Sequence, residues 1–330
     1  NGDYSLSFDG VDDYMSVENL SEQIVNSNTS LMGWFKATSN GLNGQYDGIF
    51  GFRNWPNDNM GSSFYALIAW SSGIYGIESR YNYYDANISL IPNEDTWYHI
   101  ALVYEDGIFA SYLNGQLINS INAPDMITDE STDFVVGNNY VNSDNYFQGY
   151  MDDVSIWSKA ISQVELQSYI ASPPMGDEDG LVGYWNFNHT VNDQSLNGNN
   201  GNLYGNATYS TDVPTFGCTH PNASNYNPEA NLDDGSCEYE TVQIGHQVWM
   251  TENLKATHYR NGDAIDYYDY DNDPSNSDIY GKLYDWYAVD DDRGVCPETY
   301  HVPTDDEWTL LTDFLGGESV AGGEMKETGL

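Results

Sequence analysis

The segment NGDYSLSFDGVDDYMSV, residues 1–17, decides the fold of this chain. Within it, Leu6 and Phe8 alternate with serines, which is typical of a β-strand that buries one face. The pair Asp9-Gly10 then predicts a turn, further acidic residues follow, and YMSV has the composition of a second strand. The chain is therefore expected to open with strands joined by a turn.

Two later segments extend this pattern. WYHIALVYEDGIFASYLNGQLI (97–118) predicts a hairpin in which Asn114-Gly115 is the pair that a type I′ turn requires. FQGYMDDVSIWSKAISQVEL (147–166) predicts a closing strand and a helix. Together with SLSFDGVDDYM at the start, which is close to the family's usual SxxFDGxDDYV, these segments resemble the laminin-G-like, concanavalin A-like family. The resemblance implies a mostly β jelly-roll sandwich but no function, because this fold hosts lectins, adhesins, enzymes and spacers.

The helix that follows the closing strand has its own signals. Ser162 and Glu165 form a capping box, Val164, Leu166 and Ile170 give the segment an apolar side, and a Pro-Pro pair ends it. Residues 180–210 then resemble the strands that often precede SLSFDG in jelly rolls of this family. We expect them to supply outer strands to the same sandwich, so that the first domain spans 1–214. The alternative is the start of a second jelly roll.

Two cysteines bracket the compact segment GCTHPNASNYNPEANLDDGSC (217–237). A disulfide between Cys218 and Cys237 would close a short loop and stabilise it by ~3 kcal/mol; free thiols are the alternative. The segment resembles a linker repeat of exported Bacteroidota proteins, so 215–240 is predicted to be a stapled linker. It offers oxygen ligands for calcium, although the same residues also satisfy turn geometry: Asn225, Asn227, Asp233 and Asp234.

Residues 241–330 contain four ordered blocks: TVQIGHQVWMTENLKATHYRNGD, YGKLYDWYAV, RGVCPETYHVPTDDEWTLLTDFLGG and AGGEMKETG. They resemble the Fibrobacter succinogenes major paralogous domain, which implies a small α+β, C-type-lectin-like module. In that family the cysteine of the CPxxxHVP block usually pairs with one near the end of the domain. The resemblance therefore implies that the module is incomplete, that Cys296 lacks its partner, and that later residues or a neighbouring chain cover its apolar surface.

The concanavalin A-like resemblance also implies a structural calcium ion. In related sandwiches this ion bridges the FDG turn and an acidic residue of the closing strand, which here gives Asp9 and Gly10 together with Asp152 or Asp153. Carboxylate and carbonyl oxygens suit this hard cation, which would tie the two ends of the sandwich together. The alternative is a plain turn and a polar strand edge.

A sugar site needs aromatic faces next to hydrogen-bonding groups. Trp55, Trp70 and Tyr84 lie in irregular segments rich in Asn and Asp, and we expect them to bind glycan. The alternative is that they fill the core. Four other tryptophans lie within strand patterns and are predicted to be buried: Trp34, Trp97, Trp157 and Trp185.

Signals for catalysis are poor. Glycosidases of this fold carry an ExDxxE cluster, which this sequence does not contain, and HExxH and GxSxG are also absent. The histidines are scattered, and His99 and His301 are expected to be packing residues. We therefore expect no enzyme activity.

The charge of the chain narrows its partners. A formal net charge of -42 with only 9 Lys+Arg cannot neutralise phosphates, which excludes nucleic acid, and no apolar run is long enough for membrane insertion. Such a chain attracts cations, calcium above all. The resulting hypothesis is a secreted, modular bacterial surface protein that binds a glycan or a cell-surface protein in adhesion. The alternatives are an accessory module of a polysaccharide-degrading enzyme, and a structural spacer or filament subunit.

Overall fold

The computed structural model describes most of the chain: residues 3–25, 27–38, 46–52, 63–69, 76–82, 84–124, 132–139, 145–220, 223–228, 230, 237–257, 259–260, 265–297 and 299–325. The chain divides into two compact units, Asn1–Pro214 and Thr215–Leu330. Each unit is described by itself.

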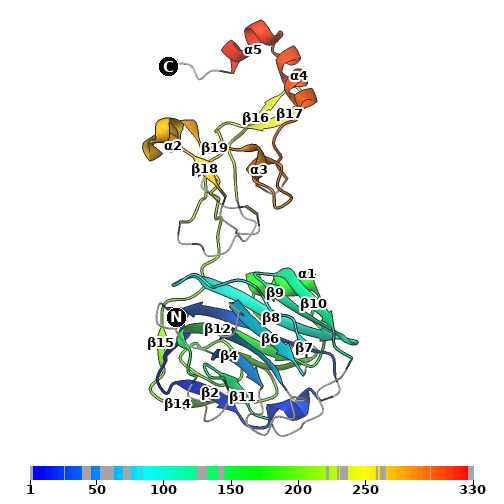
Figure 1. The fold of residues 1–330 in the computed structure, drawn as a ribbon, viewed down its shortest axis with the longest axis vertical. Coiled ribbons are helices and arrows are strands. Elements are labelled where there is room, and N and C mark those ends of the chain that lie inside the picture. Colours follow the sequence, from blue (N-terminus) through cyan, green and yellow to red (C-terminus); the bar gives the residue numbers. More distant parts are fainter. Residues whose placement is uncertain are drawn as a thin grey trace. The chain divides into compact units, whose positions relative to one another are not determined.

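The first unit is a sandwich of two antiparallel sheets (Figure 1). One has eight strands in the order β10-β9-β8-β3-β12-β1-β15, with β13 also paired to β12. Its strands are β1 (Ser5–Asp9), β3 (Thr29–Ala37), β8 (Trp97–Glu105), β9 (Ile108–Leu113), β10 (Gln116–Asn122), β12 (Gln148–Trp157), β13 (Leu181–Trp185) and β15 (Thr208–Ser210).

The other sheet has seven strands in the order β14-β2-β11-β4-β5-β6-β7. They are β2 (Tyr14–Val17), β4 (Tyr46–Phe52), β5 (Phe64–Ala69), β6 (Gly76–Tyr81), β7 (Tyr84–Asp85), β11 (Phe134–Val136) and β14 (Asn202–Tyr204). Residues 181–210 thus contribute a strand to β12, one to β2 and one to β1. The mostly β, concanavalin A-like fold that the sequence predicts is confirmed.

The main hydrophobic core consists of inward-facing side chains from both sheets, such as Phe35, Phe50 and Trp185. The four tryptophans that were predicted to be buried are at most 2% exposed, so this prediction is confirmed. Trp34 alternates with core residues of β3, so it faces the outer side of the eight-stranded sheet, next to His99.

One α-helix, α1 (Gln163–Ala171), and a 3₁₀ turn, η1 (Leu20–Gln23), complete the described elements of this unit. The capping box predicted at the start of α1 is present: the Ser162 hydroxyl accepts from Glu165 N, and the Glu165 carboxylate accepts from Ser162 N. Leu166 and Ile170 are buried and anchor the helix, whereas Val164 is exposed, so its place on the apolar side was wrongly predicted.

The second unit is built from small elements. It contains the hairpin β16 (Thr241–Ile244) and β17 (Gln247–Met250), the pair β18 (Tyr267–Tyr268) and β19 (Leu283–Tyr284), the turns η2 (Tyr270–Asn272) and η3 (Pro274–Asn276), and the helices α2 (Ser277–Tyr280), α3 (Trp286–Val289), α4 (Asp305–Phe314) and α5 (Glu318–Glu324). α4 begins with a capping box formed by Thr304 and Glu307, and Trp308 contacts Trp249 with 5.0 Å between ring centroids.

No helix in the described part of the chain has both the length and the apolar character to cross a membrane.

Candidate functional site

The predicted calcium bridge between the FDG turn and the closing strand is wrong as a single site. In the antiparallel pairing of β1 with β12, Asp9 faces Gln148 and Leu6 faces Met151, so Asp152 lies at the opposite end of this pairing. Four residues of strand span about 13 Å, too far for carboxylates to share one ion. The antiparallel register, which the motifs alone do not reveal, separates the two halves of the predicted site.

At the FDG turn, the structure gathers Asp9, Asp12 and Asp13 with carboxylate oxygens within 4.8 Å of one another. Three of the six carboxylate oxygens accept backbone hydrogen bonds. Asp9 Oδ1 accepts from Val11 N at 2.8 Å, and Asp13 Oδ2 accepts from Asp9 N at 2.9 Å. The other Asp13 oxygen accepts from Asn206 N. These bonds explain the acidic cluster as a turn, and calcium at Asp9 and Gly10 stays a prediction.

Asp152 and Asp153 lie where β12 changes its partner. Residues 148–151 pair with β1, residues 154–157 pair with β13, and the two acids form the bulge between them, with Asp153 at φ 47°. Asp152 is 1% exposed, and in the described part of the chain its Oδ2 has no hydrogen-bond partner. Burying a carboxylate oxygen without a partner costs free energy, and a bound cation or a proton on the carboxyl group would reduce this cost.

The electrostatics of this pair follow from its burial. Burial is the main cause that raises the pKa of Asp153 to about 7; the hydrogen bond from the Tyr184 hydroxyl opposes the rise, and the nearby Asp3 charge adds to it. Burial and the Asp153 charge also raise the pKa of Asp152 well above its usual value. Adjacent carboxyl groups in this setting fit a hard cation with oxygen ligands, and a bound cation would favour their charged forms.

The aromatic residues that were predicted to bind sugar have mixed positions. Trp55 and Trp70 lie outside the described residues. Tyr84, in β7, is half-buried and packs against the main core. Its role in binding stays a prediction, but its ring is engaged by the core on at least one side.

The structure brings together a different aromatic group, at the edge of the seven-stranded sheet. Tyr204 of β14 faces Tyr14 of β2, and their rings stack with centroids 4.5 Å apart and planes 4° apart. Tyr146 lies beside Tyr14 at 6.3 Å. Met15 and Val17 point into the core, so Tyr14 and its partner face outward, and Tyr204 is 40% exposed.

The acidic turn positions this tyrosine pair. The Asp13 carboxylate holds Asn206 N, next to the turn at Gly205 that follows β14. Gly205 has φ 74°, and a Cβ there would lie 2.5 Å from Asp13 Oδ1, so only glycine fits. Asp13 therefore fixes Tyr204 beside Tyr14 through a contact between residues far apart in the sequence.

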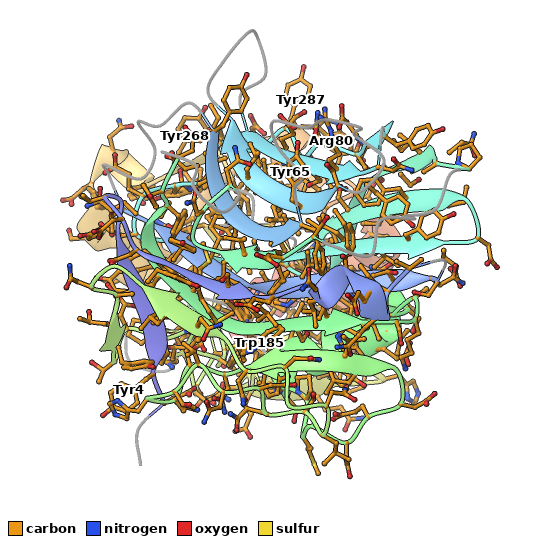
Figure 2. All side chains as sticks on the ribbon, turned by 90° about the horizontal axis from the view of Figure 1, so that it is seen from below. Tyr4, Tyr65, Arg80, Trp185, Tyr268 and Tyr287 are labelled. Atoms are coloured by element: carbon orange, nitrogen blue, oxygen red, sulfur yellow. A yellow bond between two sulfur atoms is a disulfide. The ribbon has the colours of Figure 1, made fainter. Side chains whose placement is uncertain are left out.

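The same sheet carries a polar network on the outer side of β5, β6 and β7. Tyr65 donates its hydroxyl to Glu78 at 2.8 Å, and the Arg80 guanidinium donates to both Asp85 oxygens at 2.5 and 3.0 Å. Figure 2 shows Tyr65 and Arg80 side by side, and 5.9 Å separates the guanidinium carbon from the tyrosine ring centroid. Tyr65 and Glu78 are buried, so this network stabilises the sheet and is not an open binding surface.

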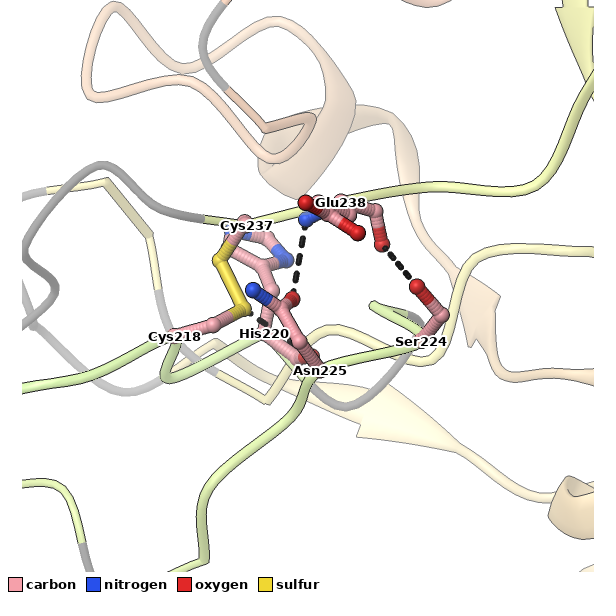
Figure 3. Close-up of a disulfide and its surroundings, with 6 residues drawn as sticks. All are labelled: Cys218, His220, Ser224, Asn225, Cys237 and Glu238. Carbon is pink, nitrogen blue, oxygen red and sulfur yellow. Dashed lines mark hydrogen bonds between the residues drawn. A yellow bond between two sulfur atoms is a disulfide. The ribbon is translucent and has the colours of Figure 1, made fainter.

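In the second unit, the predicted disulfide between Cys218 and Cys237 is present (Figure 3). Asn225 Oδ1 accepts from Glu238 N at 2.9 Å, and Asn227 N donates to the Cys218 carbonyl at 2.9 Å. The asparagines thus serve the turn geometry, and their binding of calcium stays a prediction. Asp233 and Asp234 lie outside the described residues.

The two histidines that were expected to pack behave differently. His99 is buried against the edge of Trp34, as expected. His301 is exposed, and its Nε2 lies 2.9 Å from Glu307 Oε1, so the packing prediction for His301 is wrong. The HVPT turn just before α4 places His301 within reach of the capping glutamate. Cys296 is a free cysteine.

Family comparisons agree with the motifs. Residues 9–167 match the family model of the concanavalin A-like lectin/glucanases superfamily. Residues 242–329 match the Fibrobacter succinogenes major domain, so the chain combines these two domains in the predicted order. No curated protein sequence matches the chain.

Solved structures share the fold at low sequence identity. A candidate carbohydrate binding protein from Bacteroides ovatus ATCC 8483 aligns with a TM-score of 0.50 and 16% identity over 63% of this chain and 60% of that one. A heptameric SAP-like pentraxin from Limulus polyphemus aligns at 0.40 and 16%, over 52% and 85%. Domain 4 of AbnA, a GH43 extracellular arabinanase from Geobacillus stearothermophilus, aligns at 0.41 and 19%, over 50% and 75%.

Proposed function

We propose that the first unit is a non-catalytic carbohydrate-binding module whose binding surface is the tyrosine pair Tyr14–Tyr204. The observation that carries this proposal is the stacked, outward-facing pair at a sheet edge, with Tyr146 beside it. Aromatic faces that remain open to solvent are the groups on which sugar rings stack. A grouped, exposed apolar surface often marks a binding site, and a ligand that covers these rings would account for their placement.

Polar groups for the sugar hydroxyls lie next to the rings. Asn202 follows the same outward alternation on β14 and is exposed. Asp133 is close enough to Tyr14 to raise the pKa of its phenol, after burial and the two neighbouring tyrosines. Amide and carboxylate groups beside an aromatic face supply the orientation and specificity of a sugar site.

The wider role extends the proposal. An exported protein that uses this module in adhesion at a bacterial surface agrees with the disulfide, which forms in oxidising compartments, and with the strong negative charge. The Bacteroides structure has a similar fold and is described as a candidate carbohydrate binding protein, which supports the proposal of carbohydrate binding. The alternative role is that of an accessory binding module in a polysaccharide-degrading enzyme. Such a module would use the same site, but a catalytic domain would accompany it.

A glycan array with the full chain tests the proposal. Tyr204→Ala should weaken binding of any glycan that is retained by about tenfold, since it removes one aromatic face worth about 1–3 kcal/mol in comparable stacking. Leu203→Ala is the matched control, because Leu203 lies on the same strand but faces Met15. Absence of any retained glycan, or equal loss in both variants, would contradict the proposal.

The second proposal is a structural calcium ion at Asp152 and Asp153. The specific observation is the buried Asp152 Oδ2 without a partner. Thermal melts of the full chain should show a higher Tm with calcium than with a chelator, and Asp152→Asn should abolish the difference. Asp12→Asn, in the other acidic cluster, is the control that should retain it. Identical melts would contradict calcium binding, and loss only in Asp12→Asn would place the ion at the FDG turn.

A further inference from the structure

The second unit contains a half-open cavity of about 320 Å³. It lies where the stapled segment meets the β16–β17 hairpin, and residues from both line it: Ser224, Tyr239, Met250, Thr251, Glu252 and Lys255. The cavity belongs to a different unit from the tyrosine pair, so what it binds is independent of the function proposed above.

We propose that this cavity binds a small uncharged sugar. Its apolar wall is formed by Tyr239 and Met250, both half-buried. The Tyr239 ring is held edge-on by Tyr300 at 5.5 Å and by His220 at 6.0 Å between centroids. A fixed aromatic ring and a polarisable thioether give the apolar face of a sugar ring a surface to contact.

Hydroxyl groups line the other side. Ser224 Oγ donates to the Glu238 carbonyl at 3.2 Å (Figure 3), and Thr251 Oγ1 donates to the Glu240 carbonyl at 3.2 Å. Because each hydroxyl proton is committed to a backbone carbonyl, each oxygen presents its lone pairs to the cavity. The site therefore offers fixed acceptors for the hydroxyl donors of a sugar.

A charged pair supplies both a donor and an acceptor. Lys255 Nζ lies 2.8 Å from Glu252 Oε2, so neighbouring sugar hydroxyls can bridge the ammonium and the carboxylate. Glu240 adds a further negative charge to the lining. With Lys255 neutralised by its partner, an anionic sugar meets net repulsion, which selects uncharged sugars.

The cavity volume sets the ligand size. Ligand pockets usually span about 300–1,000 Å³, so a cavity at the lower limit of this range suits one or two sugar rings. A longer glycan would have to extend through the open side.

Saturation-transfer NMR of the full chain tests this proposal, in a Tyr204→Ala background that reduces the contribution of the jelly-roll surface. The probes are the methyl glycosides of glucose, galactose, mannose and N-acetylglucosamine, with glucuronic acid as the anionic comparison. At least one uncharged glycoside should receive saturation well above glucuronic acid. Lys255→Met should weaken its binding by about tenfold or more, the usual effect of losing one charge-assisted hydrogen bond.

Lys282→Met is the matched control, because Lys282 forms an equivalent ion pair with Asp269 outside the cavity. Thr251→Trp, which fills the cavity, is the second variant and should abolish the signal. No transfer above glucuronic acid, or signals that Lys255→Met and Thr251→Trp leave unchanged, would overturn the proposal. None of these outcomes bears on the proposed sugar site at Tyr14 and Tyr204, because that site is tested separately by the glycan array with Tyr204→Ala.

Discussion

The two units of this chain treat their aromatic residues in opposite ways. In the sandwich, the largest side chains are enclosed between or against sheets, and Trp185 is fully buried, stacked on Phe134 at 5.2 Å. In the second unit, Trp286 is 68% exposed and Trp308 is 44% exposed. The buried residues there form a much smaller cluster: Ala256, Tyr259, Ile265, Ala288 and Val295.

This difference shows two ways to hold a chain together. Two paired sheets share one extensive apolar core, so the sandwich is stabilised mainly by burial. The second unit relies on local devices: the Cys218–Cys237 disulfide, the capping box of α4, and ion pairs such as Lys282–Asp269. Breaking a core residue, a staple or a cap should therefore have different consequences in the two units.

The largest expected contrast compares two tryptophans. Trp185→Ala should lower the free energy of unfolding of the first unit by about 3–5 kcal/mol, because it leaves a cavity in the core. Trp286→Ala should change that of the second unit by less than about 0.5 kcal/mol, since most of its ring is already in water. Calorimetry that resolves the two unfolding transitions measures both. A large loss for Trp286→Ala would show that a partner or another part of the chain covers that ring.

The disulfide provides the next contrast. The bond closes a loop of 19 residues, and its removal by Cys218→Ser with Cys237→Ser should cost the second unit about 3 kcal/mol. The transition of the first unit should not move, because the bond lies entirely within residues 215–330. Reduction of the wild-type protein is the companion measurement. A shift of the sandwich transition would contradict the independence of the two units.

A smaller effect depends on pH and belongs to the sandwich. Burial lowers the pKa of His99 to about 3, whereas the unfolded residue titrates near 6.5. Between these values the unfolded state binds the extra proton, so this residue reduces stability by about 1.4 kcal/mol per pH unit as the pH falls below 6.5.

His99→Phe keeps an aromatic ring beside Trp34 and removes the titration. The difference in unfolding free energy between variant and wild type should therefore shift in favour of the variant by about 2 kcal/mol between pH 6.5 and pH 5. Other titrating groups are common to both proteins and cancel in the difference. A difference that stays constant with pH would show that His99 takes up a proton as readily in the folded state as in the unfolded state.

The sequence predicts what depends on local pattern. The alternation around Phe8, the Asn114-Gly115 turn and the capping boxes at Ser162 and Thr304 are each specified by neighbouring residues, and the structure contains all of them. The alternation even shows that Tyr14 faces outward, because Met15 and Val17 are apolar and flank a serine.

Sites whose position depends on the register between distant strands cannot be predicted from such local patterns. The calcium bridge failed because the pairing of β1 with β12 places Asp9 opposite Gln148, and a bulge at Asp153 then changes the partner of β12. The tyrosine surface was missed because Tyr204 reaches Tyr14 across a pairing between strands far apart in the chain. Each position results from long-range pairing, which no short motif encodes.

The smallest contrast uses two equivalent helix caps. Ser162→Ala and Thr304→Ala each remove a side chain that accepts from the third backbone N–H of its helix, at a cost of about 1 kcal/mol. In α1 the buried Leu166 and Ile170 join the helix to the sandwich, so the cost should appear in the global unfolding of the first unit. In α4 only Leu311 is buried, so the cost should appear as local fraying, seen as faster amide exchange across residues 305–314 without a shift of the main transition. Ser168→Ala, away from the cap of α1, controls for the loss of a serine hydroxyl. Global destabilisation of equal size in both cap variants would show that α4 is as firmly packed as α1, and the proposed difference between the two units would then be wrong.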